Sequence, residues 1–393
     1  MIKKIVFGII VVILVGGCVG YFYFWDVEEK QGLKPVEKRK IINDKVNEKV
    51  KYEIDNGIFK DYYKDAYEIV KEMTLDEKIA QLLLVRYPDE NQKEVLEQYQ
   101  FGGYLFFAKD FKNKTKEDVI HMINTVQSVS KIPILTALDE EGGIVVRVSS
   151  NPNLRESKFL SSQELYRQGG LDKIREDTIE KSNLLNSLGL NLNLAPVVDV
   201  STNSNDYMYK RSIGENAQIT SEFASVVIEA SKNTGISYTL KHFPGYGNNV
   251  DTHSGASLDN RSLESLHEVD LKPFEAGIKS GAEAILVSHN IVTAIDSENP
   301  ASLSGSINKL LREELGFTGV VIIDDLVMGA VKDIPNKSLK SLMAGNDLLI
   351  TTNYLESIGE IKGGIDRGEI TEEDLDKHVI RVLAWKYDKG LLK

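Results

Sequence analysis

The sequence is poor in cysteine and proline and has no excess of basic residues, and these shortages exclude several classes of protein. Its one cysteine is Cys18, so no disulfide can form within the chain, and the body can hold neither a cysteine-ligated metal nor a thiol nucleophile. With 47 Lys and Arg against 59 Asp and Glu, the net charge of −12 argues against a nucleic-acid-binding surface. Although the prolines number only 9, the 30 glycines and 42% hydrophobic residues give a composition that is ordinary for a globular protein. A chain of 393 residues has room for one large α/β barrel or two smaller domains.

Residues 1–25 differ from the rest because a long uncharged stretch follows Lys3 and Lys4. This stretch, from Ile5 to Trp25, is long enough to cross a bilayer as a helix, and its basic flank predicts that the body lies outside the cytoplasmic membrane. One interpretation is an uncleaved anchor with an aromatic interfacial end. The other is a lipoprotein signal, because residues 15–18 resemble a cleavage box that leaves a lipid on Cys18. The terminal position and basic flank disfavour a buried core helix.

Residues 26–58 are rich in Glu, Lys, Asp and Asn, which predicts a solvated stalk between the membrane segment and the body. The remaining residues, 59–393, are expected to form a single catalytic domain. No internal repeat or low-complexity tract interrupts them.

From Thr74 onward, apolar runs of strand length alternate with segments of helical pattern. Thr74 and Glu77 have the spacing of a capping box, which predicts a helix start. Eight apolar runs predict a closed parallel (β/α)8 barrel of the TIM type, although the first run can instead belong to the Thr74 helix. The runs are 82–85, 104–107, 133–138, 190–195, 237–240, 284–287, 320–323 and 347–351.

Polar side chains follow six of these runs. They are Asp139, Asp199 after Pro196, Lys241 with His242, His289, Asp324 and Asn353. A TIM barrel places its chemistry at the carboxyl ends of its strands, so we expect these groups to converge on one site. A doubly wound open sheet also gathers polar groups there, but around one switch point rather than after six strands.

Asp324 follows four β-branched residues, so it should be held rigidly at the mouth of the barrel. A carboxylate in this position can attack an anomeric carbon and form a glycosyl-enzyme intermediate. The alternative is a strand-end Asp that caps the next helix or pairs with Lys or Arg. Asp325 is expected to point away from the site, which suits a capping role.

Asp251 and His253 lie two residues apart in a loop rich in Gly and Asn. In an extended segment, positions i and i+2 face the same side. The Asp251 carboxylate could then stabilise the charged imidazole, which would donate its other proton to a leaving oxygen. The alternative is a loop histidine that contacts only solvent.

Four further residues are candidates for substrate binding. Lys241 can bind sugar hydroxyls or, in another chemistry, form a Schiff base. His242 suits a ligand, a sugar contact or a supporting role, while Asp139 can accept bonds from two adjacent hydroxyls. Arg211 offers a fork of donors, with a surface ion pair as the alternative.

Together these motifs resemble the β-N-acetylhexosaminidases of glycoside hydrolase family 3 in their single-barrel form. The likeness covers about residue 70 to residue 393. The matching segments are 73–79, 102–103, 139–147, 194–200, 211–214, 241–247 with Asp251 and His253, 287–289, 301–304 and 319–328.

The resemblance implies that Asp324 is the nucleophile and that Asp251 with His253 supplies the general acid/base. It also implies that the remaining matched positions form the sugar pocket or support it. We expect substrate contacts from Asp139, Arg147, Arg211, Lys241, His242 and His289, and supporting roles for Asp199 and Tyr246. Neither a metal nor an organic cofactor is expected.

Two positions depart from the family pattern. The family often has His where Tyr246 stands, and it commonly has Ser where Thr252 stands. The loop before Asp251 is also slightly shorter than usual. Family β-glucosidases lack the Asp-x-His element and usually carry a second α/β domain, so the hexosaminidases are the better match.

The sequence therefore predicts a monomeric, retaining exo-β-N-acetylglucosaminidase, tethered outside the cytoplasmic membrane and acting on peptidoglycan fragments or related glycans. Phosphate could replace water as the acceptor, because a neutral imidazole does not repel an anion. Two other interpretations are a Schiff-base lyase that uses Lys241 and a non-catalytic muropeptide-binding protein.

Overall fold

The computed structural model describes residues 57–247, 252, 255 and 257–393. The predicted membrane segment, 1–25, and nearly all of the predicted stalk, 26–58, lie outside these residues, as do Asp251 and His253. Within the described part, no helix combines the length and the apolar character that crossing a bilayer requires.

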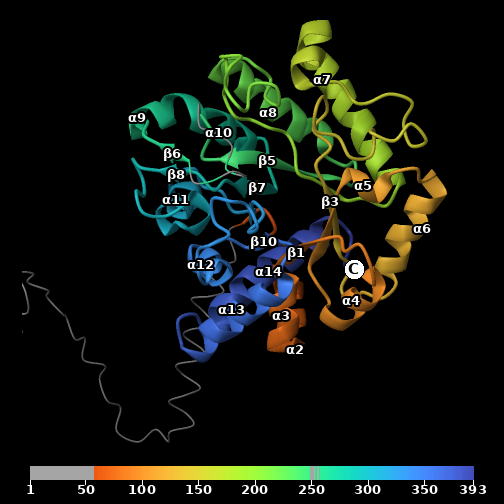
Figure 1. Ribbon diagram of the computed structural model, residues 1–393, viewed down its shortest axis with the longest axis vertical. Coiled ribbons are helices and arrows are strands. Elements are labelled where there is room, and N and C mark those ends of the chain that lie inside the picture. Colours follow the sequence, from red (N-terminus) through yellow and green to blue (C-terminus); the bar gives the residue numbers. More distant parts are fainter. Residues whose placement is uncertain (1–56, 248–251, 253–254, 256) are drawn as a thin grey trace, which may run out of the picture. The chain divides into compact units, whose positions relative to one another are not determined.

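Eight parallel strands close into a barrel in the order β1-β10-β9-β7-β5-β4-β3-β2, and helices surround it (Figure 1). The (β/α)8 barrel expected from the sequence is thus confirmed. The barrel strands are β1 (Leu83–Arg86), β2 (Gly103–Phe106), β3 (Leu135–Leu138), β4 (Leu192–Asn193), β5 (Ser237–Phe243), β7 (Ala284–Val287), β9 (Val320–Ile323) and β10 (Leu348–Thr351). Their side chains are almost all buried, as parallel strands covered on both faces require.

The longer helices are α2 (Tyr63–Glu72), α3 (Leu75–Gln81), α4 (Gln92–Tyr99), α6 (Lys116–Gln127), α7 (Ser162–Ser187), α8 (Ala217–Ser231), α10 (Leu271–Lys279), α12 (Lys337–Met343), α13 (Tyr354–Asp366) and α14 (Glu372–Asp388). Shorter helical segments are α5 (Ala108–Phe111), α9 (Leu263–Ser265), η1 (Leu266–Asp270), η2 (Ala301–Leu303), α11 (Gly305–Lys309) and η3 (Leu310–Glu314). In α14, Trp385 is fully buried and its indole N–H donates to Ser237 at the start of β5, which ties this helix to the barrel.

The start of α3 is the capping box that the sequence predicts. The Thr74 hydroxyl accepts a bond from the Glu77 N–H at 3.3 Å, and the Glu77 carboxylate accepts one from the Thr74 N–H at 3.0 Å. The helix ends at Gln81, so the first apolar run belongs to strand β1 and not to this helix.

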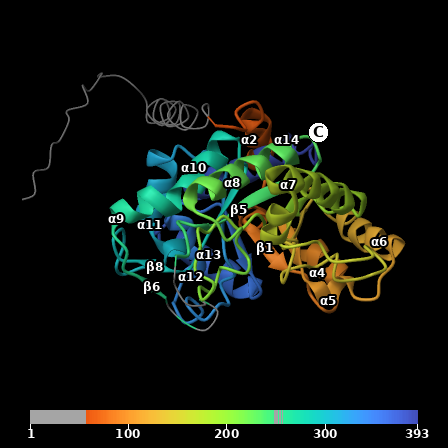
Figure 2. The ribbon, with the colours of Figure 1, turned by 90° about the horizontal axis from the view of Figure 1, so that it is seen from above.

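Two local features differ from the sequence-based expectation. Strand β5 continues to Phe243, so Lys241 and His242 lie within the strand rather than after it. A small parallel sheet of β6 (Leu258–Asp259) and β8 (Ile291–Val292) was not predicted, because two-residue strands leave no apolar periodicity. Figure 2 shows β6 and β8 at one end of the barrel, and α2 with the C-terminus at the other.

Candidate active site

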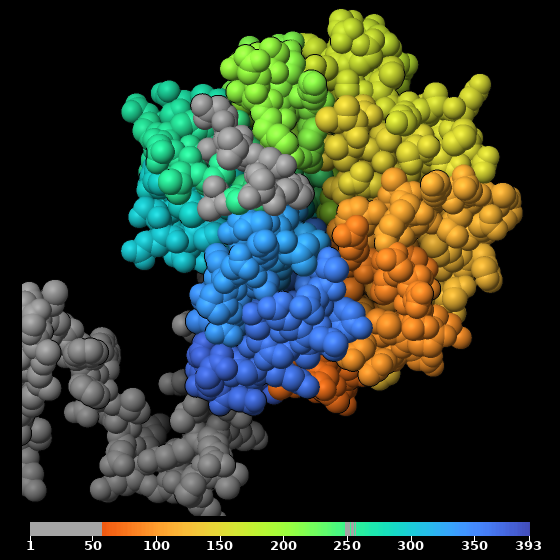
Figure 3. Space-filling model, in the orientation of Figure 1, coloured from red at the N-terminus to blue at the C-terminus, as the bar shows by residue number. Residues whose placement is uncertain are grey.

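A cavity of about 520 Å³ opens at the carboxyl ends of the barrel strands. Figure 3 looks onto this face, where a hollow is bordered by residues coloured orange and yellow on one side and blue on the other. The polar and aromatic residues that line the cavity are Arg86, Phe107, Asp139, Arg147, Tyr207, Arg211, Lys241, His242, Asp324 and Asp325. The structure therefore gathers six residues of the predicted site, Asp139, Arg147, Arg211, Lys241, His242 and Asp324, around one space.

Asp324 follows β9 directly, and its backbone N–H continues the barrel ladder by donating to Val287 O at 3.1 Å. One carboxylate oxygen accepts the backbone N–H of Asp325 at 2.8 Å. Within residues 57–247 and 257–393, no Lys or Arg forms an ion pair with Asp324, so the alternative of a structural ion pair is not supported there. A rigidly held carboxylate that keeps lone pairs toward the cavity is what attack on carbon requires.

Around the same cavity, three cations and two carboxylates form one network. The Lys241 ammonium lies 2.7 Å from Asp139 Oδ1 and 2.7 Å from Glu141 Oε1. Arg211 binds Glu141 through two parallel bonds of 3.0 and 2.6 Å, and Arg147 reaches Asp139 at 3.2 Å. Such a network fixes each side chain, and Asp139, Arg147 and Lys241 all line the cavity.

Within this network, the attraction between opposite charges offsets the cost of burying them. Burial opposes ionisation of the Asp139 carboxyl, but Lys241 and Arg147 outweigh it and hold its pKa below the ordinary value. The pKa of the Glu141 carboxyl is likewise held well below its usual range, because Arg211 and Lys241 overcome the cost of burial. The pKa of Arg211 is raised, since Glu141 more than offsets burial. At neutral pH both carboxylates are therefore ionised and can only accept hydrogen bonds.

Glu141 lies in the same motif as Asp139 but is not among the predicted site residues. The signal that could have found it is the i, i+2 spacing, which puts Asp139 and Glu141 on one side of the extended chain. Glu140 between them faces the other way, and its carboxylate accepts the backbone N–H groups of Arg147 and Val148, both at 2.7 Å. Glu140 thus shapes the loop that carries Arg147, while Glu141 holds Lys241 and Arg211.

His242 is oriented by Asp199, which is almost fully buried. Asp199 Oδ2 lies 2.7 Å from His242 Nδ1, and Oδ1 accepts the backbone N–H of Tyr246 at 2.7 Å. This contact fixes the imidazole so that its Nε2 side faces Arg211, 3.5 Å away, and the cavity. Asp199 supports the site from behind, as the resemblance implies, and His242 lies on the cavity wall.

His289 is placed differently from the expectation of a substrate contact. Its side chain is fully buried and is not among the described residues that line the cavity. Its Nδ1 lies 2.7 Å from the Ser302 hydroxyl, and its Nε2 lies 3.1 Å from the backbone carbonyl of Asp325. Through these two contacts His289 braces the chain beside Asp324.

Asp325 lines the cavity but keeps its own loop in place. One carboxylate oxygen accepts the Val327 N–H at 3.2 Å, and the other accepts the Thr352 hydroxyl at 3.3 Å. Burial raises the pKa of Asp325 above its ordinary value. The expectation that Asp325 points away from the site is therefore wrong, because it lines the cavity. It caps no helix, since the next one, α12, begins at Lys337; its carboxylate holds the turn after β9 instead.

Thr252, the residue between Asp251 and His253, is buried and held from two sides. Its N–H donates to the Tyr246 hydroxyl at 2.9 Å, and the two side-chain hydroxyls lie 2.8 Å apart. Its carbonyl accepts the N–H of Ala330, in the loop after β9, at 3.1 Å. The two departures from the family pattern, Tyr246 and Thr252, therefore bind each other. Burial raises the pKa of Tyr246 to about 12, so its hydroxyl stays protonated.

Replacing Tyr246 by Phe is expected to lower kcat about 2- to 10-fold, which corresponds to the net loss of one or two hydrogen bonds. KM should change little, because Tyr246 does not line the cavity. Steady-state kinetics of Tyr246→Phe, Thr252→Val and the double variant measure this coupling, with Thr252→Ser as the control that keeps the hydroxyl. If Tyr246→Phe and Thr252→Val reduce kcat additively, the two side chains do not act together.

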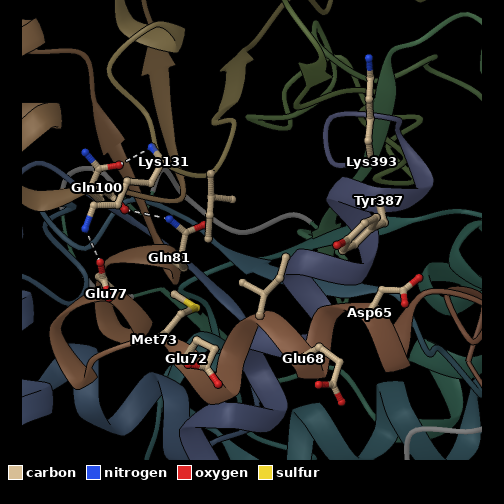
Figure 4. A pocket seen from close by; sticks show the side chains of 12 residues that line it. Asp65, Glu68, Glu72, Met73, Glu77, Gln81, Gln100, Lys131, Tyr387 and Lys393 are labelled. Carbon is tan, nitrogen blue, oxygen red and sulfur yellow. Dashed lines mark hydrogen bonds and ion pairs between the residues drawn. The ribbon is translucent and has the colours of Figure 1, made fainter.

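A larger cavity, of about 700 Å³, lies at the amino ends of the strands, between α2, α3 and the end of α14 (Figure 4). Lys131 pairs with Glu77 there, and Gln81 donates to the Gln100 carbonyl. TIM barrels place catalysis at the carboxyl ends of their strands, and none of the predicted site residues lies in this cavity. We therefore assign the site to the smaller cavity.

No group of three or more His, Cys, Asp or Glu side chains is placed to hold a metal ion in the described ranges. Asp139 is committed to Lys241 and Arg147, and Asp325 to a backbone N–H and a hydroxyl, whereas Asp324 accepts one backbone N–H through one oxygen. This donor set suits hydrogen bonding to a polyhydroxylated ligand.

The sequence matches the family described as the glycosyl hydrolase family 3 N-terminal domain over residues 74–385. It is 31% identical over 268 residues to a β-hexosaminidase of Stenotrophomonas maltophilia, covering 66% of this chain and 78% of the relative. It is 28% identical to β-hexosaminidase A of Pseudoalteromonas piscicida, covering 75% of this chain but only 54% of that protein. The chain thus spans about half the length of this second relative.

Among solved structures, the chain is similar to a glycoside hydrolase family 3 β-N-acetylglucosaminidase from Paenibacillus sp.. The TM-score is 0.76 and the sequence identity is 25%, with 81% of this chain and 63% of that chain covered.

Proposed function

Since the chain belongs to glycoside hydrolase family 3 and is thus a glycoside hydrolase, we propose that it is a retaining exo-β-N-acetylglucosaminidase. The single observation that carries this proposal is Asp324, a strand-end carboxylate that has no Lys or Arg partner among the described residues and shares one cavity with the network of Asp139, Lys241 and Arg211. The names of the relatives support a hexosamine as the terminal sugar. We expect Asp139, Arg147, Lys241 and His242 to bind that sugar.

In the first step, an oxygen of Asp324 forms a bond to the anomeric carbon as the glycosidic C–O bond breaks. His253, supported by Asp251, protonates the departing oxygen. In the second step, His253 takes a proton from water, whose oxygen attacks the same carbon and releases the sugar and Asp324. Two inversions give net retention. The roles of Asp251 and His253 come from the sequence motif, because both lie outside the described residues.

The proposed substrates are peptidoglycan fragments or other glycans that end in β-linked GlcNAc, and the proposed location is the outer face of the cytoplasmic membrane. Residues 1–25 support this location, as an uncleaved anchor or as a lipoprotein signal ending at Cys18. An enzyme held there by its N-terminus meets glycans of the cell wall.

The direct test compares 4-nitrophenyl β-glycosides of GlcNAc and glucose with purified protein, with and without phosphate. We expect kcat/KM for the GlcNAc glycoside to exceed that for the glucoside at least about 100-fold. A site that hydrogen-bonds the acetamide of GlcNAc leaves its own polar groups unpaired when the glucoside, which lacks the acetamide, binds. Turnover should not depend on phosphate. Release of a sugar phosphate would favour phosphorolysis, and binding without turnover would favour a muropeptide-binding protein.

A Schiff-base lyase is disfavoured by the surroundings of Lys241. Its amine is almost fully buried and engages two carboxylates at 2.7 Å, so it is not presented to a carbonyl carbon.

A further inference from the structure

Arg86 is the cation of the cavity that the family pattern and the network around Lys241 leave unexplained. It is the last residue of β1, and its guanidinium lies 4.1 Å from the centre of the Phe107 ring, just after β2. Parallel pairing of β1 with β2, which sets Arg86 opposite Leu105, brings these two side chains together. Stacking on an aromatic face positions a guanidinium and leaves the N–H groups at its edge available for a ligand.

The other cations of the cavity each have a carboxylate partner. Arg147 pairs with Asp139, Arg211 with Glu141, and Lys241 with both carboxylates. Across the described ranges, Arg86 has no hydrogen bond or ion pair to any side chain, and its guanidinium packs on the Phe107 ring. A partly buried guanidinium with unused donors is a ready site for an anion.

A purely structural role for Arg86 is not supported by its neighbours. Asp89, Asp110 and Asp325 lie within reach of the charge of Arg86, but each binds other groups. Asp325 accepts the Val327 N–H and the Thr352 hydroxyl, Asp110 accepts the Phe107 N–H, and Asp89 pairs with Lys109. Asp324, for its part, accepts the N–H of Asp325 and forms no ion pair with Arg86. Arg86 therefore forms no ion pair that would hold any of these carboxylates in place.

The terminal sugar does not account for this charge either. N-acetylglucosamine is uncharged, and a dense set of polar partners for its hydroxyls lies on the side of β3 and β5, at Asp139, Lys241 and His242. The rim of the cavity carries two exposed apolar side chains, Ile144 and Val327, which are 67% and 42% exposed. Apolar surface beside an unpaired cation suits a leaving group with an apolar body and an acidic substituent.

Resting on the proposed function, we propose that Arg86 binds a carboxylate on the leaving-group side of the scissile bond and makes this enzyme selective for acidic glycans. Phe107 holds the guanidinium in orientation, and the side chains of Ile144 and Val327 cover the apolar part of the leaving group. In this arrangement Arg86 is a specificity-determining residue that takes no part in the chemistry at the anomeric carbon.

The test uses two disaccharides that differ by one acidic group. In one, GlcNAc is β-1,4-linked to N-acetylmuramic acid, which carries a lactyl carboxylate; in the other, it is β-1,4-linked to GlcNAc. For Arg86→Gln we expect kcat/KM on the acidic disaccharide to fall about 10- to 100-fold, the usual worth of a hydrogen-bonded charge pair. On the neutral disaccharide the change should stay within about 2-fold.

Arg86→Lys separates charge from geometry, because an ammonium retains the charge but lacks the planar fork, and it should recover only part of the selectivity. Arg155→Gln is the matched control. Arg155 also stacks on a phenylalanine, Phe159, at 4.0 Å, but it pairs with Glu180 and does not line the cavity. This control should leave kcat/KM unchanged on both disaccharides.

Equal losses on the two disaccharides would assign Arg86 to the sugar pocket and overturn the inference. No loss on either disaccharide would overturn it as well. Failure of the proposed function is distinguishable from both outcomes, because the unmodified enzyme would then hydrolyse neither disaccharide nor an aryl GlcNAc glycoside.

Discussion

Replacing Asp324 by Asn should lower kcat about 10⁴-fold or more, because the amide cannot form the glycosyl-enzyme intermediate. The carboxylate has no cationic partner among the described residues, so its removal does not leave a buried charge uncompensated. The thermal unfolding midpoint should consequently stay close to that of the unmodified protein. Steady-state hydrolysis of an aryl GlcNAc glycoside and a calorimetric scan measure both quantities.

Asp325→Asn is the matched comparison for this variant. Asp325 is adjacent in sequence, lines the same cavity and carries the same charge, but its oxygens bind Val327 N–H and Thr352. An amide can keep one of these bonds through its carbonyl oxygen, so the loss should stay below about 10-fold. If Asp325→Asn were the more damaging change, the assignment of the nucleophile would be reversed.

Replacing His253 by Ala should lower kcat about 10²- to 10⁴-fold on a substrate with a poor leaving group, as loss of a general acid usually does. The loss should be much smaller on a 2,4-dinitrophenyl glycoside, whose leaving oxygen needs no proton. Added azide should accelerate breakdown of the intermediate and yield a β-glycosyl azide, because attack on an α-linked enzyme ester inverts the carbon.

Asp251→Asn should reproduce this pattern in weaker form, because the amide no longer stabilises the charged imidazole. The comparison of leaving groups is decisive. A loss for His253→Ala that is equal for poor and activated leaving groups would contradict the assignment of His253 as the proton donor.

The barrel could be predicted from the sequence because its strands are short, mostly apolar runs that are almost fully buried. The run Val320–Ile323 is the clearest case, since it ends in Asp324 and predicts both a core strand and the carboxylate at its tip. The β6–β8 sheet could not be predicted, because its two-residue strands pair across a distance in sequence that no local pattern reports.

The site was predicted where residues belong to a motif and missed where their meaning comes from contacts. Lys241 and Asp139 were found from their motifs, but their direct pairing at 2.7 Å depends on the closure of the barrel. His289 was expected at the substrate, but it is buried against Ser302 and is not among the described residues that line the cavity, a placement that no motif reports. Arg86 belongs to no motif and was not predicted, since its placement beside Phe107 depends on the register of β1 against β2.

One experiment addresses the chemistry most directly: incubation with a 5-fluoro N-acetylglucosaminyl fluoride, followed by proteolysis and mass spectrometry of the labelled peptide. The trap slows breakdown of the intermediate more than its formation, so the sugar stays attached to the residue that attacks. We expect the label on Asp324 and none in the Asp324→Asn variant. A label on another carboxylate, or turnover with no covalent species and an inverted product, would contradict the mechanism proposed for this enzyme.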